Sequence, residues 1–226
     1  MNVVVLASRK GGSGKSTLTA HLAAEAARPS RPTLLIDADP QGSLSLWHGL
    51  RDGDNPALKR ATRSVDEAVR AAKRDGYDWV FVDTPPYKSA AVADAIRAAT
   101  IVIIPTRPSL FDIDSVRETI ALCRELKKPY MAVINAAPPK RVDAEAASVA
   151  LAREQLSTTG APVWSGQITQ RTDFSAAVEC GEGAKAFDPE SLAAAEIARL
   201  WRAVERSTRA IDAARQHARG ASRNAA

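Results

Sequence analysis

The segment Lys10–Thr17, KGGSGKST, constrains the fold more than any other part of the chain. It follows the apolar run Val3–Ala7 and opens a helical pattern that continues through Leu22. Glycines let backbone N–H groups turn inward and approach phosphate oxygens closely, and a helix N-terminus adds partial positive charge. Lys15 can reach the β- and γ-phosphates, and the Ser16 hydroxyl can ligate Mg²⁺. Strand, loop and helix in this order predict a phosphate loop for a nucleoside triphosphate rather than a glycine-rich turn.

Short apolar runs alternate with helical patterns along the rest of the chain. The runs are nearly continuous in apolar residues, as is typical of parallel strands covered on both faces. The predicted strands are Val3–Ala7, Thr33–Ile36, Trp79–Val82, Ile101–Ile104, Tyr130–Ile134 and Pro162–Trp164. The predicted helices are Lys15–Arg28, Val65–Arg74, Ala90–Ala98, Asp114–Leu126, Ala144–Leu156 and a long one from about Pro189 to Gln216. This rhythm predicts an α/β fold with a doubly wound, mostly parallel sheet flanked by helices, of the P-loop NTPase type.

Length and composition narrow the class of protein. The 226 residues suit a single ATPase domain over 1–218, followed by a small, polar tail over 219–226 that we expect to be disordered. No apolar run approaches the ~20 residues that a membrane span needs, and no signal peptide is visible. We therefore expect a cytoplasmic protein. The two cysteines, Cys123 and Cys180, form no CxxC pair, so we expect no disulfide framework in that compartment.

Two acidic segments follow predicted strands. Asp83 ends the buried run Val80–Val82, where a carboxylate points into the ligand crevice of such a sheet and can hold Mg²⁺ directly or through water. Asp37 and Asp39 lie two residues apart after the second strand, in a segment that also has the composition of a turn. One of the two carboxylates can orient a water molecule or assist Mg²⁺ while the other supports it.

At these residues the chain resembles the ParA/MinD family of deviant Walker-A ATPases, and most closely the small ParA-type partition and positioning ATPases. The family motif KGGxGK[ST]T is present as Lys10–Thr17, and DxDPQG is present as Asp37–Gly42. The Walker-B-like segment is Phe81–Pro86, and Pro105–Ser109 followed by Asp112 resembles the loop after the next strand. The resemblance covers residues 2 to about 200.

The resemblance implies an ATP- and Mg²⁺-dependent mechanism with two subunits that sandwich two nucleotides. Lys10, Lys15 and Asp39 would be catalytic: Lys10 reaches the partner's nucleotide, Lys15 binds the β- and γ-phosphates, and Asp39 positions the attacking water. The residues of the metal site would be Ser16, Asp39 and Asp83. The implied nucleotide-binding residues are Lys10, Gly11, Gly12, Ser13, Gly14, Lys15, Ser16, Thr17, which contacts the α-phosphate, and Asn135, which reads adenine.

Positive charge is concentrated at the C-terminal end. The formal charge of the chain is +5, and residues 199–226 carry seven arginines against two acids. The pattern over 191–216 is that of an amphipathic helix with an arginine stripe opposite its apolar side. A solvated helix face is one interpretation, and a surface for DNA phosphates is the other. The candidate DNA-binding residues are Arg171, Lys185, Arg199, Arg202, Arg206 and Arg209.

Two alternatives belong to other classes. A membrane-associated positioning ATPase like the MinD branch would need a C-terminal anchor, but His217–Ala226 offers no bulky apolar residue to insert. A metabolic ATPase with an iron–sulfur cluster would use two cysteines per subunit, but Cys123 and Cys180 lie in no recognisable cluster motif.

The sequence therefore predicts a slow ATPase that forms a homodimer on ATP, binds DNA non-specifically at the nucleoid and segregates or positions a plasmid, a chromosome or a protein complex. We expect a ParB-like or cargo adaptor protein to stimulate hydrolysis.

Overall fold

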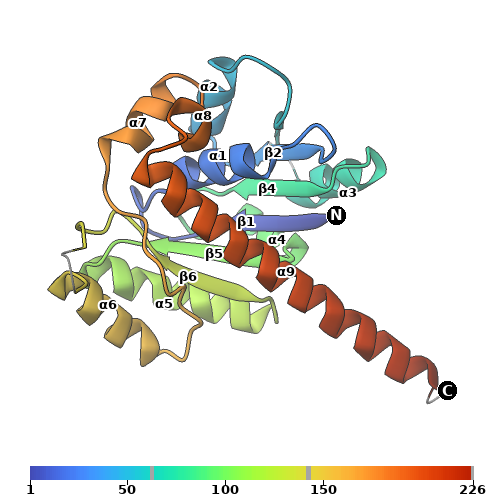
Figure 1. Ribbon diagram of the computed structural model, residues 1–226. Helices are drawn as coiled ribbons and strands as arrows, with labels where there is room; N and C mark the ends of the chain where they lie inside the picture. The colour runs from blue at the N-terminus through green and yellow to red at the C-terminus, as the bar shows by residue number, and fades with distance from the viewer. Residues whose placement is uncertain (62–63, 141–143, 225–226) are drawn as a thin grey trace.

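The computed structural model describes residues 1–61, 64–140 and 144–224, with side chains described up to residue 218. In this part of the chain one sheet of six parallel strands has the order β3-β2-β4-β1-β5-β6 (Figure 1). The strands are β1 (Asn2–Leu6), β2 (Thr33–Asp37), β3 (Ala57–Arg60), β4 (Trp79–Asp83), β5 (Ile101–Thr106) and β6 (Tyr130–Ile134). The predicted doubly wound α/β class is confirmed.

Helices cover both faces of the sheet and enclose two hydrophobic cores. One face carries α3 (Val65–Arg74), α4 (Ala90–Ala98), α5 (Leu110–Glu125) and α6 (Ala147–Ser157). The other face carries α1 (Lys15–Ala26), α2 (Ser43–Gly49), α7 (Thr172–Glu179), α8 (Ala184–Phe187) and α9 (Leu192–Asn224). Alternate residues of each central strand enter opposite cores, which is why the strand sequences are continuously apolar.

The predicted strand Pro162–Trp164 is wrong as an element. Val163 forms only an isolated parallel bridge to Ala132, and the chain then continues in an extended course beside the end of β6. The prediction also missed the edge strand β3, whose residues Ala57–Arg60 are only partly buried and carry two cations. An edge strand with one polar end lacks the apolar run that marks a central strand.

Helix α5 begins four residues before its predicted start at Asp114. The Ser109 side chain caps it, because its Oγ accepts the Asp112 N–H at 3.4 Å and donates to the Asp112 carboxylate at 2.6 Å. The short helices α2, α7 and α8 were not predicted at all.

The C-terminal helix α9 crosses the sheet face and projects beyond the sheet (Figure 1). Its apolar side packs as predicted: Leu200 and Val204 are fully buried, and the Trp201 ring meets the Trp79 ring edge-on at 4.6 Å. The helix continues to Asn224, past the predicted end near Gln216, and the disorder expected of 219–226 stays a prediction. The helix-forming composition of this arginine- and alanine-rich end accounts for the continuation. None of the described helices is long and apolar enough to cross a membrane.

Candidate nucleotide site

The carboxyl ends of the central strands bring the predicted site together. In the register of the sheet, Asp83 on β4 is the partner of Leu6 on β1 and of Asp37 on β2. The segments that follow these three strands therefore begin side by side at one edge. Ligand sites of open α/β sheets form at this edge, near the point where the strand order reverses.

The phosphate loop connects β1 to α1 and depends on two left-handed glycines. Gly12 has φ 69° and Gly14 has φ 91°. A Cβ built at Gly14 would lie 2.1 Å from Nδ2 of Asn135, so only glycine fits beside that amide. Gly14 also caps α1, since its carbonyl accepts the Leu18 N–H at 2.9 Å. The free N–H groups of the first turn therefore open toward the loop, as phosphate binding requires.

Lys15, Ser16 and Asp83 meet beneath the loop. Ser16 Oγ donates to Asp83 Oδ2 at 2.5 Å, and Lys15 Nζ donates to the Lys10 carbonyl at 3.3 Å. Burial lowers the pKa of Lys15, while Asp83 and Asp39 oppose that shift. Burial also raises the pKa of Asp83 to about 7, against the hydrogen bond from Ser16 and the charge of Lys15.

This arrangement fits Mg²⁺. Asp83 is fully buried, and its Oδ1 has no hydrogen-bond partner among the described residues. A divalent cation would favour the ionised carboxylate and use its free oxygen, with the Ser16 hydroxyl as a neighbouring oxygen ligand. The residues present at this place therefore fit a divalent cation.

The two carboxylates after β2 have different surroundings. Asp37 is buried and accepts the Ser45 N–H at 2.9 Å and the Ser45 hydroxyl at 2.7 Å, which fixes the start of α2. Asp39 is half-buried, accepts the Gln41 N–H at 3.0 Å and lines a cavity of about 340 Å³ together with Lys15 and Ser16. Asp39 therefore borders the cavity beside Lys15 and Ser16, while Asp37 supports the loop.

Lys10 occupies a different position from the other loop residues. Its side chain is exposed and does not line the 340 Å³ cavity, whereas Gly11, Gly12 and Thr17 do. Ser13, by contrast, is fully buried, and its carbonyl accepts the Asn135 amide at 2.7 Å. The action of Lys10 on a partner's nucleotide stays a prediction, consistent with its outward position.

Asn135 follows β6 and lines a second cavity of about 600 Å³ on the other side of the loop. Gly12, Gly14 and Thr17 line both cavities, so one ligand can extend from the first to the second. We call the second cavity the base pocket. Sequence reasoning missed two of its parts: Arg107, whose guanidinium lies close to Gly12, and the wall of residues 168–171. Arg107 lies in the loop after β5 that the sequence analysis singled out, whereas no sequence motif covers residues 168–171.

The structure brings together only part of the predicted DNA-binding set. Arg171, Arg199, Arg202 and Arg206 line a hollow of about 660 Å³, which we call the basic groove, with Lys140 and Glu196. Arg209 is exposed farther along α9, and Lys185 lines a separate hollow beside His21. Arg171 also forms an ion pair with Glu196 at 3.0 Å. Sequence reasoning missed Lys140, which is far from α9 along the chain. DNA contact by these residues stays a prediction.

The two cysteines lie in unlike places. Cys123 is fully buried in the core under α5, and burial raises the pKa of its thiol to about 12. Cys180 is exposed at the end of α7. Cys123 therefore packs in the hydrophobic core, and such a thiol has little thiolate available for metal binding at neutral pH.

Comparison with known proteins agrees with the geometry of the nucleotide site. Residues 4–184 match the CobQ/CobB/MinD/ParA nucleotide binding domain. Maintenance of carboxysome distribution protein A from Gloeobacter kilaueensis is 39% identical in an alignment of 128 residues that covers 52% of this chain and 55% of that protein. The chain spans about half the length of the curated relatives it matches first.

Solved structures share the fold. Apo McdA from Cyanothece superposes with a TM-score of 0.73 at 16% identity, covering 92% of this chain and 99% of that one. The septum site-determining protein MinD from Pyrococcus horikoshii, complexed with Mg-ADP, superposes with a TM-score of 0.69 at 18% identity, covering 90% and 95%. Because the family match extends over most of its length, this chain belongs to the CobQ/CobB/MinD/ParA nucleotide-binding family.

Proposed function

We propose that this chain is a Mg²⁺-dependent ATPase that dimerises on ATP, binds DNA non-specifically and segregates or positions a cargo. One observation supports the proposed ATP hydrolysis. Lys15, Ser16 and Asp39 line one cavity, and Ser16 is bonded to the buried Asp83. Phosphoryl transfer needs positioned cations, a metal ligand and a group that orients the attacking water, and these residues supply the three in one place.

The roles follow from the positions. Lys15 neutralises the β- and γ-phosphates, and Ser16 with Asp83 holds Mg²⁺. Asp39 orients the attacking water, because it faces the cavity while Asp37 is engaged with Ser45. Asn135 fixes the loop through Ser13 and borders the base pocket, which suits contact with adenine.

The exposed Lys10 supports the homodimer. A lysine of the loop that does not line its own cavity can act on a nucleotide held by a second copy of the chain. If the partner supplies part of the site, ATP binding and dimer formation stabilise each other. Hydrolysis then removes the γ-phosphate contacts and releases the dimer, which makes the protein a timed switch.

The basic groove supports the DNA part. The exposed Arg199, Arg202 and Arg206 line it from α9, and Lys140 lines it from the loop after β6. Guanidinium and ammonium groups in a row contact phosphates without reading bases. A dimer presents the groove twice, so its affinity for a long duplex exceeds that of the monomer.

Two substitutions test the ATPase assignment. Asp39→Ala should keep ATP binding but slow phosphate release by about 100-fold or more, because the water loses its orienting carboxylate. The variant should remain an ATP-bound dimer in light scattering. Lys15→Ala should not bind ATP. Asp94→Ala, which removes a half-buried acid on α4 that pairs with Arg97, is the matched control and should hydrolyse at the wild-type rate. Undiminished hydrolysis by Asp39→Ala would refute the role of Asp39.

A further inference from the structure

The base pocket and the basic groove share a wall. Residues 168–171 line the base pocket, and two of them, Thr169 and Arg171, also line the basic groove. The two hollows are therefore separated there by a single extended segment. A displacement of this segment must change both hollows at once, because Thr169 and Arg171 line both of them.

Backbone hydrogen bonds hold the wall against the end of β6. Ile168 N–H donates to Ile134 O at 2.9 Å, Ala137 N–H donates to Ile168 O at 3.0 Å, and Gln170 N–H donates to Ala137 O at 2.8 Å. Side chains alternate along an extended segment, so Thr169 and Arg171 point to the same side. That side faces α9.

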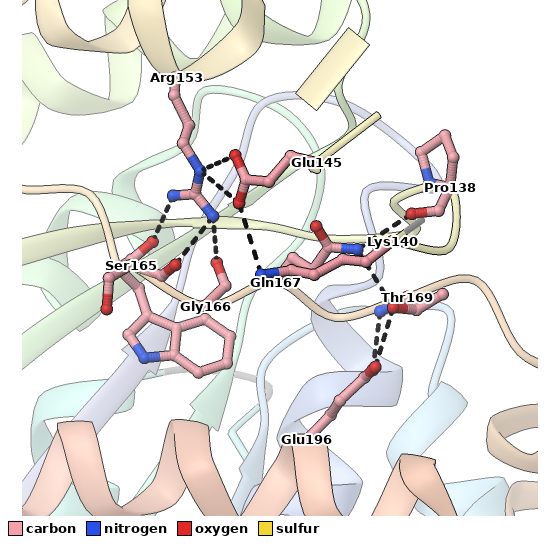
Figure 2. Close-up of polar contacts among 10 residues, drawn as sticks. Pro138, Lys140, Glu145, Arg153, Ser165, Gly166, Gln167, Thr169 and Glu196 are labelled. Carbon is pink, nitrogen blue, oxygen red and sulfur yellow. Dashed lines mark hydrogen bonds and ion pairs between the residues drawn. The ribbon is translucent and has the colours of Figure 1, made fainter. Parts of the chain in front are cut away.

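Glu196 of α9 fastens the wall on that side (Figure 2). Its carboxylate accepts the Thr169 N–H at 2.8 Å, the Thr169 hydroxyl at 2.8 Å and the Arg171 guanidinium at 3.0 Å. Figure 2 also shows Gln167 donating to the Pro138 carbonyl, at 3.0 Å, which ties the start of the wall to the loop after β6. One side chain of α9 therefore makes three bonds to the wall.

The charges of Glu196 and Arg171 make the contact between α9 and the wall sensitive to a ligand in the basic groove. Glu196 is 4% exposed, and Arg171 is its salt-bridge partner. Arg171 also lines the basic groove, so a phosphate bound there competes with Glu196 for the guanidinium. Without Arg171, the buried carboxylate keeps only neutral donors, which raises the cost of its charge. The contact between Glu196 and the wall is then less stable, and the wall can shift.

We propose that Glu196 is a positioning residue that couples the nucleotide pocket to the basic groove through the wall of residues 168–171. The identity of the two ligands, ATP and the phosphates of a DNA duplex, rests on the proposed function. Because coupling is reciprocal, a duplex in the groove tightens ATP binding by the same factor by which ATP tightens duplex binding.

The test measures this factor in the full chain. A fluorescent, non-hydrolysable ATP analogue is titrated with and without a saturating random-sequence duplex. The wild-type dissociation constant should fall by about fivefold or more when the duplex is present. Glu196→Gln keeps the shape of the side chain and an oxygen for Thr169 but loses the charge that holds Arg171. In this variant the factor should fall to within about twofold of unity.

Two further variants separate the proposal from other causes. Glu190→Gln removes an exposed acid shortly before α9 and should keep the wild-type factor. Thr169→Val removes one bond to Glu196 without changing any charge, and it should also lower the factor. Dimer formation with the analogue, followed by light scattering, should be the same in all variants.

The possible outcomes distinguish the coupling role of Glu196 from the proposed function. A wild-type factor in both Glu196→Gln and Thr169→Val overturns the coupling role and leaves the proposed function intact, since avidity of the dimer then explains the linkage. Loss of dimer formation in these variants also overturns it. No duplex binding by the wild type, with or without nucleotide, removes the DNA part of the proposed function and the coupling with it.

Discussion

Replacement of Gly14 by alanine should destabilise the free protein strongly. The residue has φ 91°, and the new Cβ would meet Nδ2 of Asn135 at 2.1 Å. The left-handed backbone costs an L-residue about 1–2 kcal/mol. Displacement of Asn135 breaks its 2.7 Å bond to the buried Ser13 carbonyl, which costs about 1–3 kcal/mol. Alanine reduces the entropy of the unfolded chain and returns about 0.4–1 kcal/mol. The net loss in the free energy of unfolding should be about 2–4 kcal/mol.

The assay is urea unfolding without nucleotide, followed by tryptophan fluorescence. Gly11→Ala is the matched control, because a Cβ at Gly11 meets nothing within 4 Å and its φ is not in the left-handed range. This control should change the free energy of unfolding by less than about 1 kcal/mol.

A double-mutant cycle then isolates the contact with the amide. In an Asn135→Ala background the clash is absent, so Gly14→Ala should cost only the backbone strain. The two substitutions should therefore couple by about 1–3 kcal/mol. Additive effects, within about 0.5 kcal/mol, would refute the close approach of Asn135 to the phosphate loop.

Two further predictions concern the helices that cover the same face. Burial lowers the pKa of His21 on α1 to about 4, while its Nδ1 accepts the Ala184 N–H at 3.1 Å. On acidification the unfolded state takes up this proton at a higher pH than the folded state does. His21 therefore contributes its full share to the free energy of unfolding above about pH 6.5, and about 3 kcal/mol of that share is lost as the pH drops toward 4. His21→Gln should lose that part of the pH dependence in urea unfolding, and an unchanged slope would contradict the burial argument. Trp201→Ala should lower the free energy of unfolding by about 3–5 kcal/mol, because the ring is 4% exposed and packs on Trp79. A loss below about 1 kcal/mol in thermal or urea unfolding would show that α9 is not part of the core.

Local signals in the sequence were sufficient for much of the fold and for the centre of the site. Strands with continuous apolar runs and a phosphate loop between a strand and a helix carry their information in adjacent residues. Lys15, Ser16, Asp39 and Asp83 meet because parallel strands end at one edge, so their convergence could be predicted.

Other parts depend on contacts between residues far apart in the chain. The edge strand β3 is partly exposed, so the apolar signal is weak. The wall of residues 168–171 is extended because of hydrogen bonds to the end of β6 and to Glu196, neither of which has a local pattern. The separation of Lys185 from the arginine stripe follows from the packing of α8 beside α1, which the charge pattern does not specify.

In the proposed function, ATP controls attachment to DNA. Fluorescence anisotropy of a labelled random-sequence duplex, measured with ATP, ADP or no nucleotide over a salt series, tests it most directly. The account predicts binding with ATP that is much weaker with ADP or without nucleotide, indifferent to sequence and steeply reduced by salt, because phosphate contacts release counterions. Binding of equal strength in the three nucleotide conditions, or no binding at low salt, would contradict it.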